Sequence, residues 1–97
     1  MKPYSLHPEA LEELQRQAIY YEERGEGLGS RFTEQVEAAA KLAAAMPGIG
    51  SPYKYGTRRV FPTDFPFSVV YRDAGDELFI IAVAAFRRKP GYWRSRK

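Results

Sequence analysis

The sequence predicts an α+β fold in which a helical hairpin packs on a small, mainly antiparallel sheet. Three observations support this prediction. Apolar residues recur at helical spacing between residues 8 and 46, β-forming residues dominate residues 57–86, and segments rich in glycine and proline separate the elements. The chain of 97 residues fits one domain, residues 1–97, and leaves no room for a second. The predicted order of elements is β-α-α-β-β-β.

The first elements are a short strand at residues 4–6 and a helix that begins at His7-Pro8. Proline suits the first helical position, and the acidic side chains of the first turns suit the positive end of the helix dipole. The apolar stripe of this helix has spacings of three, four and three residues and comprises Leu11, Leu14, Ala18 and Tyr21. Gly25 is the expected C-cap.

A second helix should follow Gly27-Leu28-Gly29 and end at Pro47-Gly48. Its apolar stripe comprises Leu28, Phe32, Val36, Ala39, Ala43 and Met46. Its other face is also apolar, with Ala38, Leu42 and Ala45, and small residues there should allow close approach of a neighbouring helix. Because the link between the helices is short, we expect them to form an antiparallel hairpin.

The second half of the chain predicts three strands, at residues 57–61, 67–72 and 77–86, with residues 48–56 as a loop before them. The last strand is apolar enough to be central and buried on both faces. Its apolar run of nine residues, 78–86, is far shorter than the roughly 20 residues that span a bilayer. The first residues lack the apolar stretch of a signal peptide. We therefore expect a cytoplasmic protein without membrane contacts.

The net charge of +3 conceals an asymmetry between the two halves of the chain. Residues 1–46 contain five Lys/Arg and eight Asp/Glu, whereas residues 47–97 contain ten and four. After Ala84 the chain has six basic residues and no acidic one. A positive region of this kind attracts phosphate or acidic protein surfaces. The alternative is a basic tail that only improves solubility.

Few residues suit catalysis or cofactor binding. His7 is the only histidine and cysteine is absent, so we expect neither a metal site nor another cofactor. His7 should cap a helix or be exposed. The acidic pairs Glu12-Glu13 and Glu22-Glu23 are interpreted as a solvated helix face rather than an acid–base dyad. The glycines of residues 25–29 lack the flanking features of a phosphate-binding loop.

Cations and aromatic residues are the better candidates. Arg58-Arg59 lie on one predicted strand and Arg87-Arg88 at the end of another, so these four arginines can gather near one edge or face of the sheet. Tyr92-Trp93 add flat apolar surfaces beside them. Arginine binds carboxylate or phosphate with two parallel hydrogen bonds, and aromatic rings stack on bases. The partner is then RNA or an acidic protein, and Trp93 is either core or contact surface.

The sequence resembles the RelE/ParE superfamily, the toxins of type II toxin–antitoxin pairs, and especially its ParE-like (plasmid stabilisation) branch. The resemblance covers nearly the whole chain. The segments that carry it are Pro8-Glu9-Ala10 with Leu14, Ile19-Tyr20-Tyr21, Leu28-Gly29 with Phe32, Met46-Pro47, Arg58-Arg59, Phe65-Pro66-Phe67 with Val69 and Tyr71, and Val83 to Trp93 with Arg96. Each segment is weak evidence alone, whereas their order and spacing together are specific.

This resemblance implies the same fold and a cognate antitoxin, in a hetero-oligomer, whose C-terminal segment wraps around the toxin. It also implies one of two targets. ParE-like members act on DNA gyrase, and RelE-like members cleave mRNA on the ribosome without a metal. The ribonuclease branch has a catalytic arginine where this chain has Ser68, and other members often have a histidine near Ala85-Phe86. These differences favour a non-enzymatic gyrase inhibitor.

Under this first hypothesis the target-binding residues are Arg58, Arg59, Arg87, Arg88, Tyr92, Trp93, Arg94 and Arg96. Under the second, a metal-independent mRNA interferase, Arg59 and Arg87 would stabilise phosphate and Tyr92 would transfer a proton. A degenerate toxin that only binds its antitoxin and a stand-alone RNA-binding module are further alternatives. The antitoxin segment could lie on exposed apolar surface as a helix, add a strand to a sheet edge, or do both.

Overall fold

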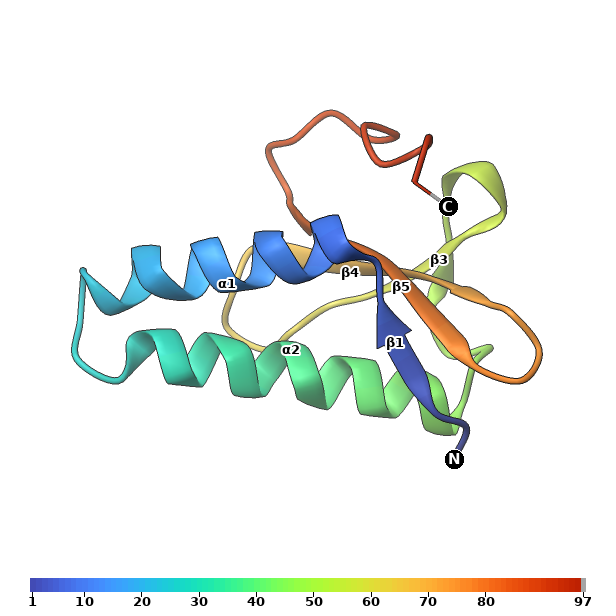
Figure 1. Cartoon of the computed structure of the whole chain (residues 1–97), viewed down its shortest axis with the longest axis horizontal. Coiled ribbons are helices and arrows are strands. Elements are labelled where there is room, and N and C mark those ends of the chain that lie inside the picture. Colours follow the sequence, from blue (N-terminus) through green and yellow to red (C-terminus); the bar gives the residue numbers. More distant parts are fainter. Residues whose placement is uncertain (97) are drawn as a thin grey trace.

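Residues 1–96, which the computed structural model describes, form two long helices and one five-stranded sheet (Figure 1). The elements are β1 (Tyr4–Leu6), α1 (Pro8–Glu22), α2 (Leu28–Ala45), β2 (Ser51–Pro52), the 3-10 turn η1 (Lys54–Gly56), β3 (Arg58–Val60), β4 (Phe67–Asp73) and β5 (Leu78–Ala85). The α+β class and the helical hairpin are confirmed. None of the helices in this range is both long and apolar enough to cross a membrane.

The sheet has the strand order β1-β5-β4-β3-β2. Strand β1 is parallel to β5, and the other neighbours are antiparallel. The prediction that β5 is internal and buried on both faces is confirmed. The prediction of residues 48–56 as a loop is wrong in part, because Ser51–Pro52 pairs with β3. A two-residue edge strand that contains proline leaves no periodic signal.

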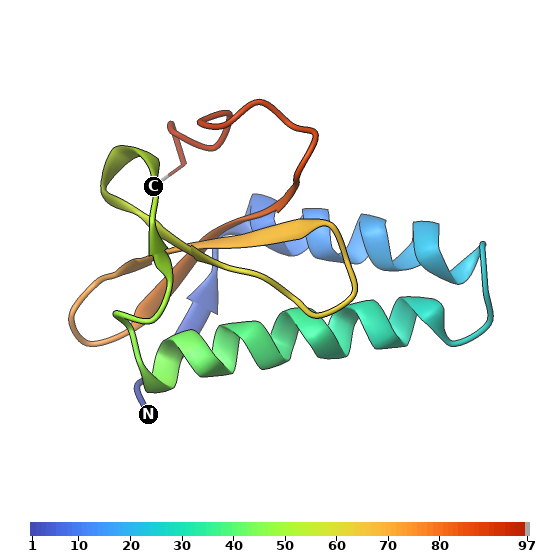
Figure 2. The ribbon, with the colours of Figure 1, turned by 180° about the vertical axis from the view of Figure 1, so that it is seen from behind.

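The two faces of the sheet are covered by different parts of the chain. The helical hairpin packs on one face, where Phe32 is fully buried among Tyr21, Phe65 and Phe67 with ring centroids 5.0–5.2 Å apart. The opposite face holds a smaller cluster of Val70, Ile81, Ala82, Ala84 and Trp93. We call these the helix-side core and the tail-side core. In both views the segment after β5 arches past the sheet on the side away from α2 (Figures 1 and 2).

The two strands at the centre of this packing are out of register at one point. Val70 lies opposite Ala82 while the next residue, Tyr71, lies opposite Ile80, so Ile81 is an extra residue in β5. Because of this bulge, Ile81 and Ala82 both belong to the tail-side core. The helix-side core resumes at Val83.

In the predicted apolar stripe of α2, Phe32, Val36, Ala39 and Ala43 are buried, Leu28 is half-buried and Met46 at the end is exposed. The expected role of Ala38, Leu42 and Ala45 in close helix approach is wrong, because these three side chains face outward. The helices lie close together at Gly29, where a Cβ atom would overlap the carbonyl oxygen of Ala18. A buried glycine in the first turn of α2 therefore permits this contact.

Side-chain hydrogen bonds fix the N-termini of both helices. His7 Nδ1 accepts from the backbone N–H of Glu9 at 3.0 Å, which confirms His7 as a helix cap. Helix α1 ends at Glu22, and its C-cap is Glu23 rather than the expected Gly25. The carboxylate of Glu22 accepts from Gly27 N and Gly29 N at 2.9 and 3.0 Å, so it caps the N-terminus of α2. Glu22 therefore joins the two helices.

Candidate functional site

The basic, aromatic segment after β5 folds as a series of turns. Its anchor is Trp93, which is 2% exposed and packs against Tyr53 and Tyr55 with ring centroids 5.9 Å from each. Tyr55 has a left-handed backbone with φ of 61°. Gly91 lies so close that a Cβ atom there would be 2.8 Å from the Tyr55 ring. The structure thus places Trp93 in the core and makes the segment 86–96, which we call the tail, a fixed layer.

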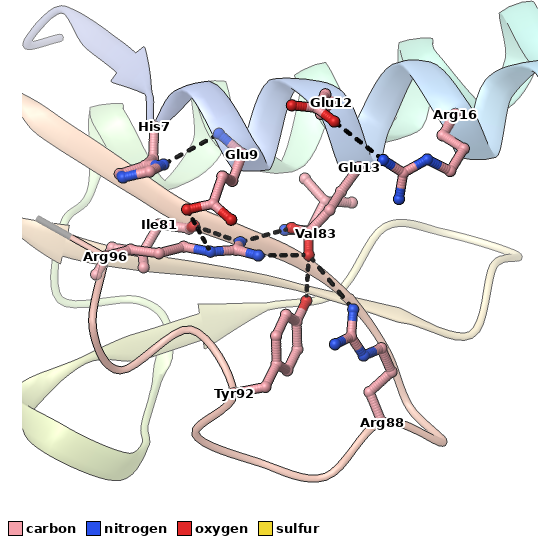
Figure 3. Close-up of polar contacts among 10 residues, drawn as sticks. All are labelled: His7, Glu9, Glu12, Glu13, Arg16, Ile81, Val83, Arg88, Tyr92 and Arg96. Atoms are coloured by element: carbon pink, nitrogen blue, oxygen red, sulfur yellow. Dashed lines mark hydrogen bonds and ion pairs between the residues drawn. The ribbon is translucent and has the colours of Figure 1, made fainter.

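A second anchor of the tail is the carboxylate of Glu13 in α1 (Figure 3). Glu13 accepts two hydrogen bonds from the Arg96 guanidinium, at 2.9 and 3.0 Å, and one from the Tyr92 hydroxyl at 2.7 Å. The side chains of Glu13 and Arg96 are only 11% and 9% exposed. A two-point bond between such groups is among the stronger polar contacts in proteins. We call Glu13, Tyr92 and Arg96 the tail anchor.

The tail anchor also completes the edge of the sheet. Strand β1 ends at Leu6, opposite Ile80. The backbone groups of β5 that follow Ile80 therefore have no neighbouring strand on this edge, whereas β4 pairs with β5 on the other edge. The N–H of Val83 donates to Glu13 at 3.0 Å, and the carbonyl of Ile81 accepts from Arg96 at 3.1 Å (Figure 3). Backbone groups of an internal strand need partners when they are buried. The carboxylate and the guanidinium therefore replace a neighbouring strand.

The prediction that Glu12 and Glu13 form a solvated face is right for Glu12 and wrong for Glu13. Glu12 is exposed and pairs with Arg16 one turn later, at 3.0 Å. Glu13 points to the tail, and three of its hydrogen-bond partners lie 70 or more residues away in the sequence. No local pattern distinguishes these two neighbouring carboxylates.

The tail anchor changes the acid–base properties of Tyr92. Burial raises the pKa of Tyr92, and its hydrogen bond to the Glu13 carboxylate raises it further. Burial opposes the charge of Arg96, but the bonds to Glu13 outweigh it and raise the Arg96 pKa. Tyr92 therefore stays a neutral hydrogen-bond donor at neutral pH and is poorly suited to take up a proton.

The four arginines of the two predicted strand pairs do not form one cluster. Arg58 donates to the Gly50 carbonyl at 2.7 Å, beside the end of α2. Arg59, on the opposite face of β3, stacks on the Tyr53 ring at 4.0 Å. Arg59 and Arg88 line one small cavity, and Arg87 lies in another hollow. Arg94 is exposed and stacks on Tyr55 at 4.6 Å.

A concave surface near the tail lies between α1 and the end of β5, with a volume of about 420 Å³. We call it the α1–β5 groove. It is lined by Gln17, Tyr20, Tyr21, Arg24, Pro66, Phe67, Ala85, Phe86 and Arg87. An adjoining hollow of about 180 Å³ shares part of this lining and adds Glu13, Arg16, Val83 and Arg88.

Four arginines border the groove and its extension: Arg16, Arg24, Arg87 and Arg88. Arg24 stacks on the Tyr20 ring at 3.5 Å and leaves its guanidinium exposed. The one acidic side chain in this lining, Glu13, is occupied by the tail anchor. Apolar walls with a basic rim suit a protein segment that carries both apolar and acidic side chains.

The contribution of α1 to this surface was not predicted from the sequence. Arg16 and Arg24 were not among the expected contact residues. A signal was present, because Gln17, Tyr20, Tyr21 and Arg24 recur at spacings of three, one and three residues and so share one helix face. Phe86 of the tail lines the groove and forms an exposed aromatic pair with Phe61, which follows β3, with ring centroids 5.8 Å apart.

Residues 1–96 contain no group of three or more His, Cys, Asp or Glu side chains that could hold a metal ion. The described part of the chain instead offers cations, aromatic rings and shallow hollows. These features bind acidic and apolar groups and supply no obvious nucleophile with an adjacent base.

Comparisons with known proteins give two findings. A family model described as the ParE toxin of the type II toxin–antitoxin system parDE matches residues 4–90. A solved chain of the chromosomal ParDE toxin–antitoxin system from P. aeruginosa is 21% identical, with a TM-score of 0.76 over 88% of this chain and 96% of that one. At this identity the second finding concerns the fold alone. A search of curated proteins gives no match.

Proposed function

The chain belongs to the ParE toxin family of type II toxin–antitoxin systems, and from this premise we propose that it binds and inhibits DNA gyrase. Family membership implies a protein antitoxin as its partner. We propose further that this antitoxin neutralises the toxin by covering its contact surface. The observation that carries the choice of gyrase over RNA is the state of Tyr92 in the tail anchor.

A ribonuclease of the related branch would need groups that take up a proton and stabilise a phosphate. The Tyr92 hydroxyl donates a hydrogen bond to Glu13, and its pKa is raised by burial and by this bond. Ser68 stands where that branch carries an arginine, and it is buried in the sheet. The residues present therefore favour binding over RNA cleavage.

The proposed contact surface consists of the exposed cations around the α1–β5 groove and on the tail. Arg87, Arg88 and Arg94 keep their predicted role in it, and Arg16 and Arg24 are added. Arg59 is partly buried beside the tail and contributes at its edge, whereas Arg58 lies beside the end of α2, away from this surface. Tyr92, Trp93 and Arg96 act indirectly in this proposal, because they hold the tail in place.

The antitoxin has apolar surface available on the helical hairpin. Leu42 in the last turn of α2 and Met46 and Ile49 just after it are 44%, 49% and 46% exposed. Ile19 of α1, which is 62% exposed, lies at the other end of the hairpin beside the start of α2. Burying such side chains contributes about 25 cal/mol per Å² of apolar area. An amphipathic antitoxin helix on this face is consistent with the wide apolar circumference of α2.

The test compares the two targets directly. Purified protein is added to a gyrase supercoiling reaction and, separately, to a translation reaction in which primer extension maps mRNA cuts. We expect inhibited supercoiling and intact mRNA. Cuts at ribosomal A sites without loss of supercoiling would overturn the proposal in favour of the interferase.

A double variant tests the contact surface. Arg87→Ala with Arg88→Ala removes two exposed cations beside the groove, and we expect at least about tenfold weaker gyrase inhibition, since contacts to charged groups contribute about 1.5–3 kcal/mol each. Arg72→Ala with Lys41→Ala is the charge-matched control, because both side chains are exposed and lie outside the groove. Equal inhibition by both double variants would exclude Arg87 and Arg88 from the contact.

A further inference from the structure

The α1–β5 groove contains aromatic rings that a ligand from solvent can reach. Tyr20 of α1 is 43% exposed, and Phe86, just after β5, is 56% exposed. The Arg24 guanidinium stacks on the Tyr20 ring at 3.5 Å and is itself exposed. Nucleotide bases stack on aromatic rings and on the planes of arginine side chains. The groove therefore offers accessible flat surfaces to a planar aromatic group.

The hollow that adjoins the groove collects positive charge. Arg16, Arg87 and Arg88 line it, all three are exposed, and we call it the arginine hollow. Arg16 pairs with Glu12 at 3.0 Å, and Arg88 lies 3.7 Å from Glu13 (Figure 3). The first pair is fully on the surface and the second is long, so both contribute little. The three guanidinium groups therefore remain available to an anion from solvent.

The groove and the arginine hollow form one continuous surface. Gln17, Phe67, Ala85 and Arg87 line both of them. The groove, at about 420 Å³, already lies within the range of small-molecule sites, which is about 300–1,000 Å³. Gln17 at the junction carries an amide that can donate to and accept from hydroxyl groups. Along this surface, flat apolar groups are followed by an amide and then by cations.

We propose that the α1–β5 groove and the arginine hollow together bind a nucleoside diphosphate. The base lies against the rings of Tyr20 and Phe86, and the phosphates lie in the arginine hollow. A diphosphate spreads more than one negative charge over several oxygens, so it can bond to several guanidinium groups at once. One carboxylate of a protein segment would leave part of this charge unmatched. The inference goes beyond the proposed function, because it assigns a small-molecule ligand to a surface so far assigned to protein contacts.

The experiment follows backbone nitrogen-15 NMR signals of the full chain during titration with ADP at constant ionic strength. Adenosine carries the base and sugar alone, and pyrophosphate carries the charge alone. We expect saturable shifts at Gln17 and Ala85 with ADP. Adenosine and pyrophosphate should each bind at least about tenfold more weakly, because the linked ligand gains from both contacts at once. Equal binding of pyrophosphate and ADP would overturn the proposal, since the base would then contribute nothing.

Variants test the two halves of the site separately. Phe86→Leu keeps an apolar side chain but removes the ring, and it should weaken ADP binding at least about fivefold and spare pyrophosphate binding. Arg16→Gln should weaken binding of both ligands about two- to fivefold. Arg72→Gln is the matched control, because Arg72 is exposed and lies outside both hollows. Backbone signals of Trp93 should stay in place in each variant, which verifies that the tail is still docked.

The proposal is overturned if ADP gives no saturable shift at Gln17 and Ala85, or if Arg72→Gln weakens ADP binding as much as Arg16→Gln. Hexaadenylate RNA that binds at least about tenfold more tightly than ADP would overturn it in favour of an RNA strand. Shifts with N-acetyl-glutamyl-leucyl-glutamate amide but not with ADP would overturn it in favour of a protein segment. None of these outcomes depends on gyrase, so failure of this site and failure of the proposed target are separate results.

Discussion

The two faces of the sheet are covered in different ways. On the helix-side core, regular elements supply aliphatic and aromatic side chains, and Phe32 and Ala43 are fully buried there. On the tail-side core, a segment without helix or strand is held by one tryptophan and one carboxylate. The helix-side core depends on many small contacts, and the tail-side core depends on a few strong ones. We expect the helix-side core to determine global stability and the tail-side core to open more readily.

The largest expected loss of stability comes from a substitution in the helix-side core. Phe32→Ala should lower the free energy of unfolding by about 3–5 kcal/mol, because it removes a fully buried ring from a packed aromatic group. Trp93→Ala should cost less, since the tail can detach while the helix-side core stays closed. Urea unfolding followed by circular dichroism measures both variants. An equal loss in the two variants would mean that the faces are one cooperative unit.

The next effect breaks the tail anchor. Glu13→Gln should lower the free energy of unfolding by about 3 kcal/mol, because it leaves the Arg96 guanidinium poorly compensated in a site that is only 9% exposed. Glu12→Gln is the matched control one residue away, and its exposed pair with Arg16 contributes about 0.3–0.5 kcal/mol. The same urea titration separates them. Similar losses in both variants would show that Glu13 is not an anchor.

A smaller effect tests how tightly the hairpin closes. Gly29→Ala places a methyl group against the Ala18 carbonyl, so the helices must move apart at a cost of about 1–3 kcal/mol. Gly48→Ala is the control, because a Cβ atom there meets no neighbour within 4 Å. Thermal unfolding measures the difference. A melting temperature for Gly29→Ala equal to that of Gly48→Ala would contradict this close contact.

The smallest effect concerns pH. The folded-state pKa of Tyr92 is raised above the ordinary tyrosine value of about 10, first by burial and then by Glu13. Its contribution to stability is therefore fully present below pH 10 and declines as the pH rises above it, because the unfolded chain loses the proton first. Above pH 10, the free energy of unfolding of Tyr92→Phe should fall less steeply with pH than that of the unsubstituted protein. Parallel plots of unfolding free energy against pH for the two proteins would rule out a contribution from Tyr92.

Sequence reasoning was most successful for the helix-side layer. Apolar residues at helical spacing predict burial against one continuous surface, and the α2 stripe from Phe32 to Ala43 obeys this rule. The α1 stripe obeys it only in part, because Leu14 is buried whereas Leu11 is 43% exposed. Strand β2 was missed, since two residues that include Pro52 cannot show a period. The stripe of α2 failed at Met46, which is exposed and follows the last helical residue, Ala45.

The tail-side layer and the candidate site were less predictable. Trp93 was left open between core and contact because its partners, Tyr53 and Tyr55, lie in a segment expected to be a loop. Glu13 and Arg96 are 83 residues apart, so no sequence window contains both. Likewise Arg16 and Arg24 meet Arg87 only after the helix has packed on the sheet. Polar contacts between residues far apart in the sequence produce no periodic sequence pattern from which they could be predicted.

At one edge of β5, side chains rather than a strand bond to the backbone, and this arrangement has a consequence for hydrogen exchange. The amide proton of Val83 is held by the Glu13 carboxylate, whereas amides of the β4–β5 ladder are held by backbone carbonyls. Undocking of the tail would strip away Arg96, loosen Glu13 and expose this one proton while the ladder stays closed. The exchange rate of a single amide therefore reports how often the tail leaves the sheet.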